Sequence, residues 1–166
     1  MIRLSRLADY AVLLMSRVAN TPDAVHNAID IAAATGLPTP TVSKLLATLA
    51  REGLLKSVRG AKGGYGLAHP AREITVAHII AAIDGPIAIT HCIEHGPGSC
   101  DVEMLCPSRV GWQAINNAVR QALEGVSLAE ISATTPPSYL ALATPPTPDS
   151  PGAVKSATAW SEETLS

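Results

Sequence analysis

Two short helical patterns separated by a four-residue turn constrain the fold of this chain more than any other feature. Asn27 is a suitable N-cap for the segment IDIAAAT, and Gly36 supplies the left-handed residue that ends a helix. The next helix is expected to begin with Thr39 as N-cap and Pro40 in its first turn, and to end at Gly53. Two such helices joined by GLPT predict a helix-turn-helix motif. The inward face of the second helix is predicted to hold Val42, Leu45, Leu46 and Leu49.

The flanking segments extend this motif. Ser5 is the expected N-cap of an amphipathic helix whose apolar residues recur at steps of three and four, namely Leu7, Tyr10, Ala11, Leu14, Met15 and Val18. After the motif, LLKSV and YGLAH predict two strands around the glycine-rich tip RGAKGG. The order of three helices and a hairpin indicates a winged helix-turn-helix. The alternative is a small α+β core with a basic loop.

The C-terminal half contains two further helical patterns. Thr75 is expected to cap VAHIIAAID, which Gly85 ends. A longer amphipathic segment, SRVGWQAINNAVRQALEGV, ends at Gly125, and its apolar stripe comprises Val110, Trp112, Ile115, Val119 and Leu123. No later segment of the chain offers an apolar partner for this stripe, so a second copy of the chain is the expected partner, in a homodimer.

The predicted fold class is mainly α with a small β wing: a winged helix-turn-helix plus a long C-terminal dimerisation helix. The expected organisation is a DNA-binding domain at 1–86, a three-cysteine loop at 87–107, the dimerisation helix at 108–131 and a tail at 132–166. The tail is rich in Pro, Ser, Thr and Ala and is expected to be disordered, because it cannot bury enough apolar surface to offset its ordering entropy.

Composition and charge narrow the function. Apolar residues make up 47% of the chain, which is enough for a core, yet no signal peptide or uninterrupted membrane span is evident. We therefore expect a cytoplasmic protein with no membrane partner. Residues 1–75 carry nine basic and five acidic side chains, whereas the rest carries three basic and nine acidic. The basic N-terminal half is a mild indication of a polyanionic partner.

Double-stranded DNA is the partner that the winged motif predicts. The second motif helix would enter the major groove by its N-terminal end, where hydroxyls and a positive charge can contact phosphates or base edges. The wing would bring its basic side chains to the DNA backbone or minor groove. The candidate contacts are Thr39, Thr41, Ser43, Lys44, Thr48 and Arg51 on the helix, and Arg59 and Lys62 on the wing. Any one of them alone is equally explained as a solvated surface residue.

All three cysteines lie in one stretch, HCIEHGPGSCDVEMLCP, as Cys92, Cys100 and Cys106. An odd number of thiols in a reducing compartment argues against a disulfide framework. The wide spacing suits an iron-sulfur cluster better than a zinc finger, because a cluster is larger than a single ion. Zinc and three unligated thiols remain the alternatives. No glycine-flanked nucleophile or phosphate loop is present, so an enzyme with a cysteine nucleophile is not expected.

The residues also carry a resemblance to a known family. MIRLSRLADYAVLLM, TGLPTPTVSKLLATLAREGLL, the wing VRGAKGGYGLA, EITVAHIIAAIDGPIAIT and the cysteine loop resemble the IscR/NsrR family of iron-sulfur transcription regulators, and most closely its SUF-system regulator branch. The resemblance covers residues 1 to about 131. The wing pattern VRG-x-x-GGY followed by three cysteines is specific in combination, and it adds Gly63 and Tyr65 to the candidate DNA-binding residues.

The resemblance implies a homodimeric regulator, a repressor, that binds a palindromic promoter element and controls iron-sulfur assembly genes of the SUF type. Each cysteine loop would hold a cluster near the dimer interface through Cys92, Cys100 and Cys106. A 2Fe-2S cluster is favoured, and a 4Fe-4S cluster is the alternative. A nitric-oxide or redox-sensing regulator of the same fold, or a zinc-binding winged-helix regulator, are the other functions to consider.

The fourth ligand of such a cluster is open. The IscR pattern has a histidine three residues after the last cysteine, where this chain has Arg109. The NsrR pattern instead uses the aspartate of a DYA phrase, supplied by the other subunit, and Asp9 occupies that place here. His91, Glu94 and His95 are competing local donors, and Asp9 is equally well explained as an ordinary helix-surface carboxylate.

Overall fold

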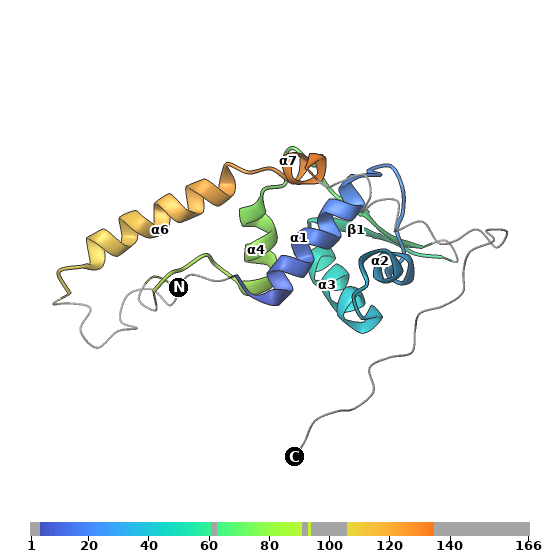
Figure 1. The fold of residues 1–166 in the computed structure, drawn as a ribbon, viewed down its shortest axis with the longest axis horizontal. Coiled ribbons are helices and arrows are strands. Elements are labelled where there is room, and N and C mark those ends of the chain that lie inside the picture. Colours follow the sequence, from blue (N-terminus) through green and yellow to red (C-terminus); the bar gives the residue numbers. More distant parts are fainter. Residues whose placement is uncertain (1–3, 61–62, 91–92, 94–105, 135–166) are drawn as a thin grey trace, which may run out of the picture.

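The computed structural model describes residues 4–60, 63–90, 93 and 106–134. These residues form a mainly helical protein with a two-stranded antiparallel sheet, which confirms the predicted fold class (Figure 1). The elements are α1 (Arg6–Ala19), α2 (Ala28–Thr35), α3 (Thr39–Arg51), β1 (Leu55–Val58), β2 (Gly64–Leu67), α4 (Val76–Asp84), α6 (Arg109–Glu124) and α7 (Leu128–Ala133).

Helix α1 lies at the centre of the fold. The Ser5 hydroxyl accepts a hydrogen bond from the Ala8 amide, so the predicted N-cap is confirmed. Leu14, Met15 and Val18 are fully buried, and α1 contacts α2, α3, α4, α7 and β2. The predicted apolar face is wrong at its first residue, because Leu7, in the first turn of α1, is 42% exposed.

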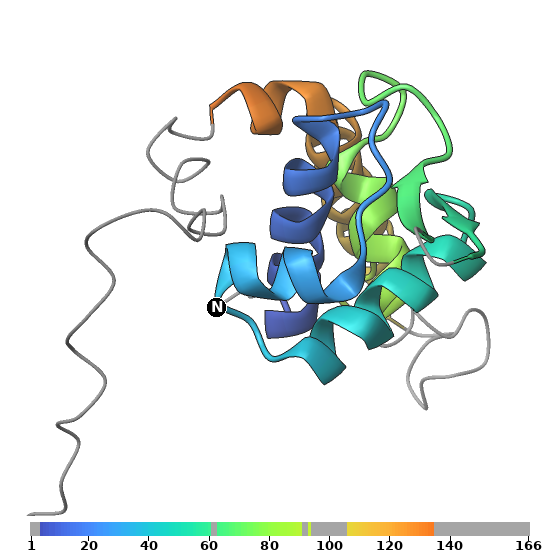
Figure 2. The same ribbon diagram turned by 90° about the vertical axis from the view of Figure 1, so that its right-hand side faces the viewer.

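The helix-turn-helix follows the predicted punctuation with one exception. Asn27 caps α2 by accepting a hydrogen bond from the Asp30 amide, and Gly36 ends the helix with a φ of 70°. Helix α3 begins one residue earlier than predicted, because the Pro38 carbonyl accepts the first helical bond from Val42. Pro38 is therefore the N-cap, and Thr39 is the first helical residue. Figure 2 shows α2 and α3, joined by their short turn, beside α1.

The wing is fastened to the segment that precedes α2. Strand β1 pairs with β2 from Leu55 opposite Leu67 to Val58 opposite Gly64. Beyond this ladder, the Tyr65 amide donates to the His26 carbonyl at 2.8 Å, and the His26 amide donates to the Tyr65 carbonyl at 2.9 Å. This close approach explains a glycine in the wing, since a Cβ added at Gly64 would lie 2.4 Å from the His26 carbonyl oxygen.

Two capping boxes lie side by side at the starts of α4 and α7. Thr75 and His78 cap α4, while Ser127 and Glu130 cap α7. The two helix starts are joined by backbone bonds from Val76 to Val126 and from Leu128 to Ile74. Hydrogen bonds from the Ser127 amide and hydroxyl hold the pKa of the exposed Glu130 carboxyl below its ordinary value.

Helix α7 was not predicted. Helix α6 ends at Glu124 with Gly125 as its C-cap, as the sequence indicated, but residues 126–131 do not continue it. They form a turn and most of α7, which packs on α1 through the fully buried Leu128. The segment 108–131, expected to be one helix, therefore contains two helices with different partners.

Helix α6 extends away from the winged part, with contacts to α4 near its C-terminal half (Figure 1). Within the described ranges, no helix combines the length and apolar character that a membrane span requires. The predicted tail at 132–166 lies, apart from its first three residues, outside the described part of the chain.

Gly64→Ala should reduce the free energy of unfolding by about 2 kcal/mol, because the new methyl group would overlap the His26 carbonyl and force the wing from the pre-α2 segment. The control is Gly66→Ala in the same strand, where the nearest atoms are Lys56 Cε at 3.4 Å and the Ala24 carbonyl at 3.6 Å. This control should change stability by less than about 0.5 kcal/mol. Urea unfolding of both variants measures the difference, and equal losses would contradict the close-approach explanation.

Candidate nucleic-acid interface and cysteine loop

Helix α3 presents a polar face opposite its buried one. Val42, Leu45, Leu46 and Leu49 are buried in the core, as predicted. Of the six candidate residues, Thr39, Lys44 and Arg51 are exposed, while Thr41, Ser43 and Thr48 are half-buried. Lys44 and Arg51 thus lie opposite the buried stripe, Thr39 is exposed in the first turn, and the three half-buried residues lie beside the stripe. Hydroxyls and amide groups in the first turn of a helix can hydrogen-bond a phosphate or base edge, and a lysine beside them adds positive charge.

Arg51 lies at the C-terminal end of this surface. Its Nε is 3.2 Å from the Glu52 carboxylate, and the two side chains are 71% and 45% exposed. Exposed ion pairs of this kind contribute about 0–1 kcal/mol. A phosphate group can therefore compete with Glu52 for the guanidinium at little cost.

The wing candidates have different environments. Arg59 is exposed at the end of β1, whereas Lys62 lies outside the described residues. Gly63 is required locally, because an added Cβ would lie 2.4 Å from the Val58 carbonyl oxygen. Tyr65 is half-buried and packs against the main core, while its backbone bonds His26. The last two residues therefore shape and fasten the wing, which is a sufficient reason for the GGY sequence.

Cys106 is the one cysteine that the described ranges contain. Its thiol is free and half-buried, and it lies three residues before the first residue of α6. Cys92, Cys100 and the competing donors His91, Glu94 and His95 lie outside those ranges. The described residues alone bring together no group of three or more metal-binding side chains.

Asp9 is exposed in the first turn of α1. Figure 1 shows the start of α6, which follows Cys106, at the outer end of that helix and away from α1. The structure therefore does not bring Asp9 and Cys106 of one chain together. Arg109, which occupies the position of the histidine in the IscR pattern, is the first residue of α6 and is exposed.

The apolar stripe of α6 is largely uncovered in the single chain. Val110 is 81% exposed, Ile115 is 47% exposed and Trp112 is 42% exposed. Val119 and Leu123 are half-buried, and Leu123 packs with Ala8, Val76 and Ile80. The outer half of α6 thus carries large apolar side chains without a partner in the described part of its own chain.

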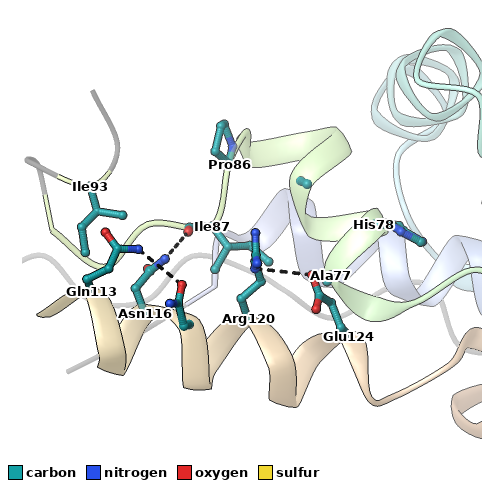
Figure 3. A pocket seen from close by; sticks show the side chains of 11 residues that line it. Ala77, His78, Pro86, Ile87, Ile93, Gln113, Asn116, Arg120 and Glu124 are labelled. Carbon is teal, nitrogen blue, oxygen red and sulfur yellow. Dashed lines mark hydrogen bonds and ion pairs between the residues drawn. The ribbon is translucent and has the colours of Figure 1, made fainter. Parts of the chain in front are cut away.

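A polar feature of α6 was missed by the sequence analysis. A hollow of about 370 Å³ separates α4 from α6, with alanine side chains of α4 on one side and a row of polar side chains of α6 on the other (Figure 3). The row comprises Gln113, Asn116, Asn117, Arg120 and Glu124. Asn116 is 5% exposed, and its amide binds the backbone of Ile87 and Ile89. An asparagine pair beside an apolar stripe was the available signal, but it does not tell which of the two is buried.

Comparison with known proteins gives a consistent result. Residues 4–134 match the model of the Rrf2 family, described as an iron-dependent transcriptional regulator. A Mycobacterium tuberculosis protein named as an HTH-type transcriptional regulator is 34% identical over 143 residues, which cover 84% of this chain and 87% of that protein. The regulator IscR of Photobacterium profundum is 31% identical over 131 residues, covering 78% and 75% of the two chains.

A solved structure agrees. The IscR structure of T. potens superimposes with a TM-score of 0.61 at 27% identity, and the match covers 84% of this chain and 96% of that one. The family model spans the helix-turn-helix, the wing, the cysteine loop and both C-terminal helices. This chain therefore belongs to the Rrf2 family of transcriptional regulators.

Proposed function

We propose that this regulator is a homodimeric repressor whose binding to a palindromic promoter element depends on an iron-sulfur cluster held by Cys92, Cys100 and Cys106. The observation that carries the proposal is the position of Cys106. It is a free, half-buried thiol just before α6, and the other two cysteines precede it within fourteen residues of sequence. The relatives named IscR support a regulator of this kind. By this proposal the regulated genes encode iron-sulfur assembly proteins of the SUF type.

DNA binding is assigned to the polar surface of α3 and to the wing. Thr41, Ser43 and Lys44 discriminate between sequences, since they lie in the first turns of α3, the helix whose N-terminal end would enter the major groove. Arg59 and Lys62 of the wing contribute mainly charge against phosphates. A palindromic site follows from two such surfaces related by the two-fold axis of a dimer.

Dimerisation is assigned to the uncovered stripe of α6. Val110, Trp112 and Ile115 would be expensive to leave in water, and burying a large apolar side chain contributes about 1.5–3 kcal/mol. The same stripe on a second copy offers a complementary apolar surface in a symmetric interface. This arrangement would place the N-terminal end of each α6, and the cysteine just before it, near the other subunit.

The donor set fits an iron-sulfur cluster. Three thiolates are soft ligands, and none of the three cysteines lies in a C-x2-C pair typical of structural zinc sites. When bound, such a cluster supplies a redox-active centre whose loss changes the charge and shape of its loop. This chain provides three thiolates and leaves one coordination position open. Arg109, at the histidine position of the IscR pattern, is a cation and cannot be the fourth ligand. Asp9 of the other subunit is therefore assigned this role, because it occupies the place of the aspartate in the NsrR pattern. His91, Glu94 and His95 are its local competitors.

Arg59→Ala should weaken binding to promoter DNA and lower the slope of log affinity against log salt by about 1, because an exposed arginine of the wing that contacts a phosphate releases about one counterion. Arg72→Ala removes the same charge from the loop before α4, where the Ala71 carbonyl accepts a bond from α7, far along the chain from α3. This control should leave the slope unchanged. Fluorescence anisotropy over a salt series measures both; an unchanged slope for Arg59→Ala would contradict the assignment of charge contacts to the wing.

Each of Cys92→Ala, Cys100→Ala and Cys106→Ala should abolish the visible absorption of anaerobically purified protein while leaving a folded dimer. The reason is that a cluster with only two protein thiolates is poorly retained. Absorption spectra, iron and sulfide assays and size-exclusion chromatography measure the outcome. Wild-type protein containing zinc but no sulfide would instead favour the zinc-binding regulator, and bleaching by nitric oxide alone would favour the nitric-oxide sensor.

Asp9→Ala should alter the cluster spectrum and the promoter affinity together, since a carboxylate is a harder and weaker iron ligand than a thiolate and its side of the cluster would be the labile one. The comparison set is His91→Ala, Glu94→Ala and His95→Ala, measured in the same way. Should Asp9→Ala keep both wild-type properties while one local variant loses them, the fourth ligand is local and the cross-subunit assignment is wrong.

A further inference from the structure

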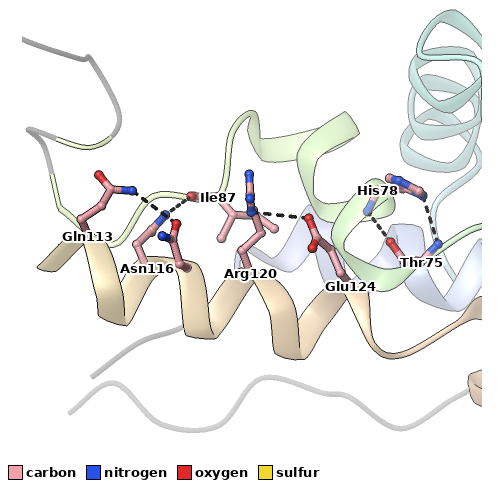
Figure 4. Close-up of polar contacts among 8 residues, drawn as sticks. Thr75, His78, Ile87, Gln113, Asn116, Arg120 and Glu124 are labelled. Carbon is pink, nitrogen blue, oxygen red and sulfur yellow. Dashed lines mark hydrogen bonds and ion pairs between the residues drawn. The ribbon is translucent and has the colours of Figure 1, made fainter. Parts of the chain in front are cut away.

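Asn116 is an unusual residue on α6. It is 5% exposed, whereas the residues next to it in the helix, Ile115 and Asn117, are exposed. Its Nδ2 donates to the Ile87 carbonyl at 3.1 Å (Figure 4). Its Oδ1 accepts from the Ile89 amide, also at 3.1 Å. One side-chain amide therefore satisfies a backbone donor and a backbone acceptor, as a neighbouring strand would.

The position of these bonds in the sequence gives them a functional meaning. Asn116 binds Ile89 across 27 residues and Ile87 across 29. All three cysteines lie between Ile89 and Asn116 in the sequence. The amide of Asn116 thus fixes the distance between the two ends of the segment that contains every thiol of the protein.

In the described part of the chain, Asn116 makes side-chain hydrogen bonds between α6 and residues 87–89. The hollow of about 370 Å³ between α4 and α6 lies beside Asn116, so close packing does not set their separation there. Ile87 and Leu123 contribute to the small apolar cluster around Ala8, Val76 and Ile80, but that cluster lies nearer the other end of α6. Cys92 follows Ile89 by three residues, and Cys106 precedes the first turn of α6. In sequence, therefore, Cys92 is close to a backbone amide that binds Asn116, and Cys106 directly precedes the helix that carries Asn116.

We propose that Asn116 is a positioning residue for the cluster: by binding the backbone of Ile87 and Ile89, it holds the first and last cysteines at the separation that the cluster requires. This inference rests on the proposed iron-sulfur function. Without these hydrogen bonds, the ends of the cysteine segment must be brought together when the cluster binds, and the cost is entropic. The cluster is then retained for a shorter time.

The test compares Asn116→Leu with Asn117→Leu in the full chain. Asn117 is the matched control because it is the same residue on the same helix, is exposed, and has a side-chain bond only to Gln113 among the contacts of the described residues. Two quantities are measured: amide hydrogen exchange at Ile89 in the metal-free protein, and the half-life of visible absorption of the anaerobic protein after addition of an iron chelator. Thermal unfolding checks that each variant is folded.

Asn116→Leu is expected to accelerate exchange at Ile89 and to shorten the absorption half-life roughly tenfold, the factor expected when a buried amide loses its hydrogen bonds. Asn117→Leu should leave both quantities at their wild-type values. Asn116→Asp is a second variant of the same size, in case the leucine variant does not fold. Its carboxylate can still accept a hydrogen bond from the Ile89 amide, but it places an oxygen, which cannot donate, next to the Ile87 carbonyl oxygen. This variant should therefore also shorten the half-life.

Three results would overturn the inference, and the first two can be told apart from failure of the proposed function. If the wild type holds iron and sulfide but Asn116→Leu and Asn116→Asp retain the wild-type half-life, the positioning role is wrong and the cluster remains. If Asn117→Leu shortens the half-life as much as Asn116→Leu, the effect belongs to α6 in general. A wild type without iron and sulfide overturns both the function and the inference.

Discussion

The burial of helix α1 is the interaction on which the rest of the structure depends. Ala8, Ala11, Leu14, Met15 and Val18 are all fully buried along its length. The two alanines allow neighbouring helices to approach closely, and the three larger side chains each contribute about 1.5–3 kcal/mol through burial. Because α2, α3, β2, α4 and α7 all contact this one helix, it fixes α3 relative to the C-terminal part.

Most of the fold could be predicted because its signals are local. Caps at Ser5, Asn27 and Thr75 depend on an amide three residues away, and the glycine at position 36 depends on its own backbone conformation. Helix α7 could not be predicted in this way. It has six residues, too few to show a helical period, and its stability comes from Leu128 in the core and from backbone bonds to residues more than fifty positions earlier.

The site was predictable in kind but not in arrangement. The polar face of α3 follows from its buried stripe, because residues three or four positions apart lie on the same face of a helix. The burial of Asn116 does not, since Asn116 and Asn117 look equivalent until Ile87 and Ile89 are placed beside one of them. Tyr65 shows the opposite case. The wing motif predicts a contact with DNA for this residue; its packing and its backbone bonds to His26 add a role in fastening the wing, which the motif does not indicate.

Helix α4 is the physical route by which a change at the cysteine segment would reach α3. Its consecutive residues Ile79 and Ile80 face different clusters: Ile79 packs in the main core with α1 and α3, and Ile80 packs with Leu123 of α6. The Ser5 hydroxyl also donates to Asp84 at the end of α4, at 2.7 Å, but this bond is exposed and contributes about 1 kcal/mol. Two buried isoleucines outweigh it. Under the proposed function, a shift of α6 would therefore be transmitted to α3 by apolar packing through α4. The hydrogen bonds of Asn116 would couple the start of the cysteine segment to that shift.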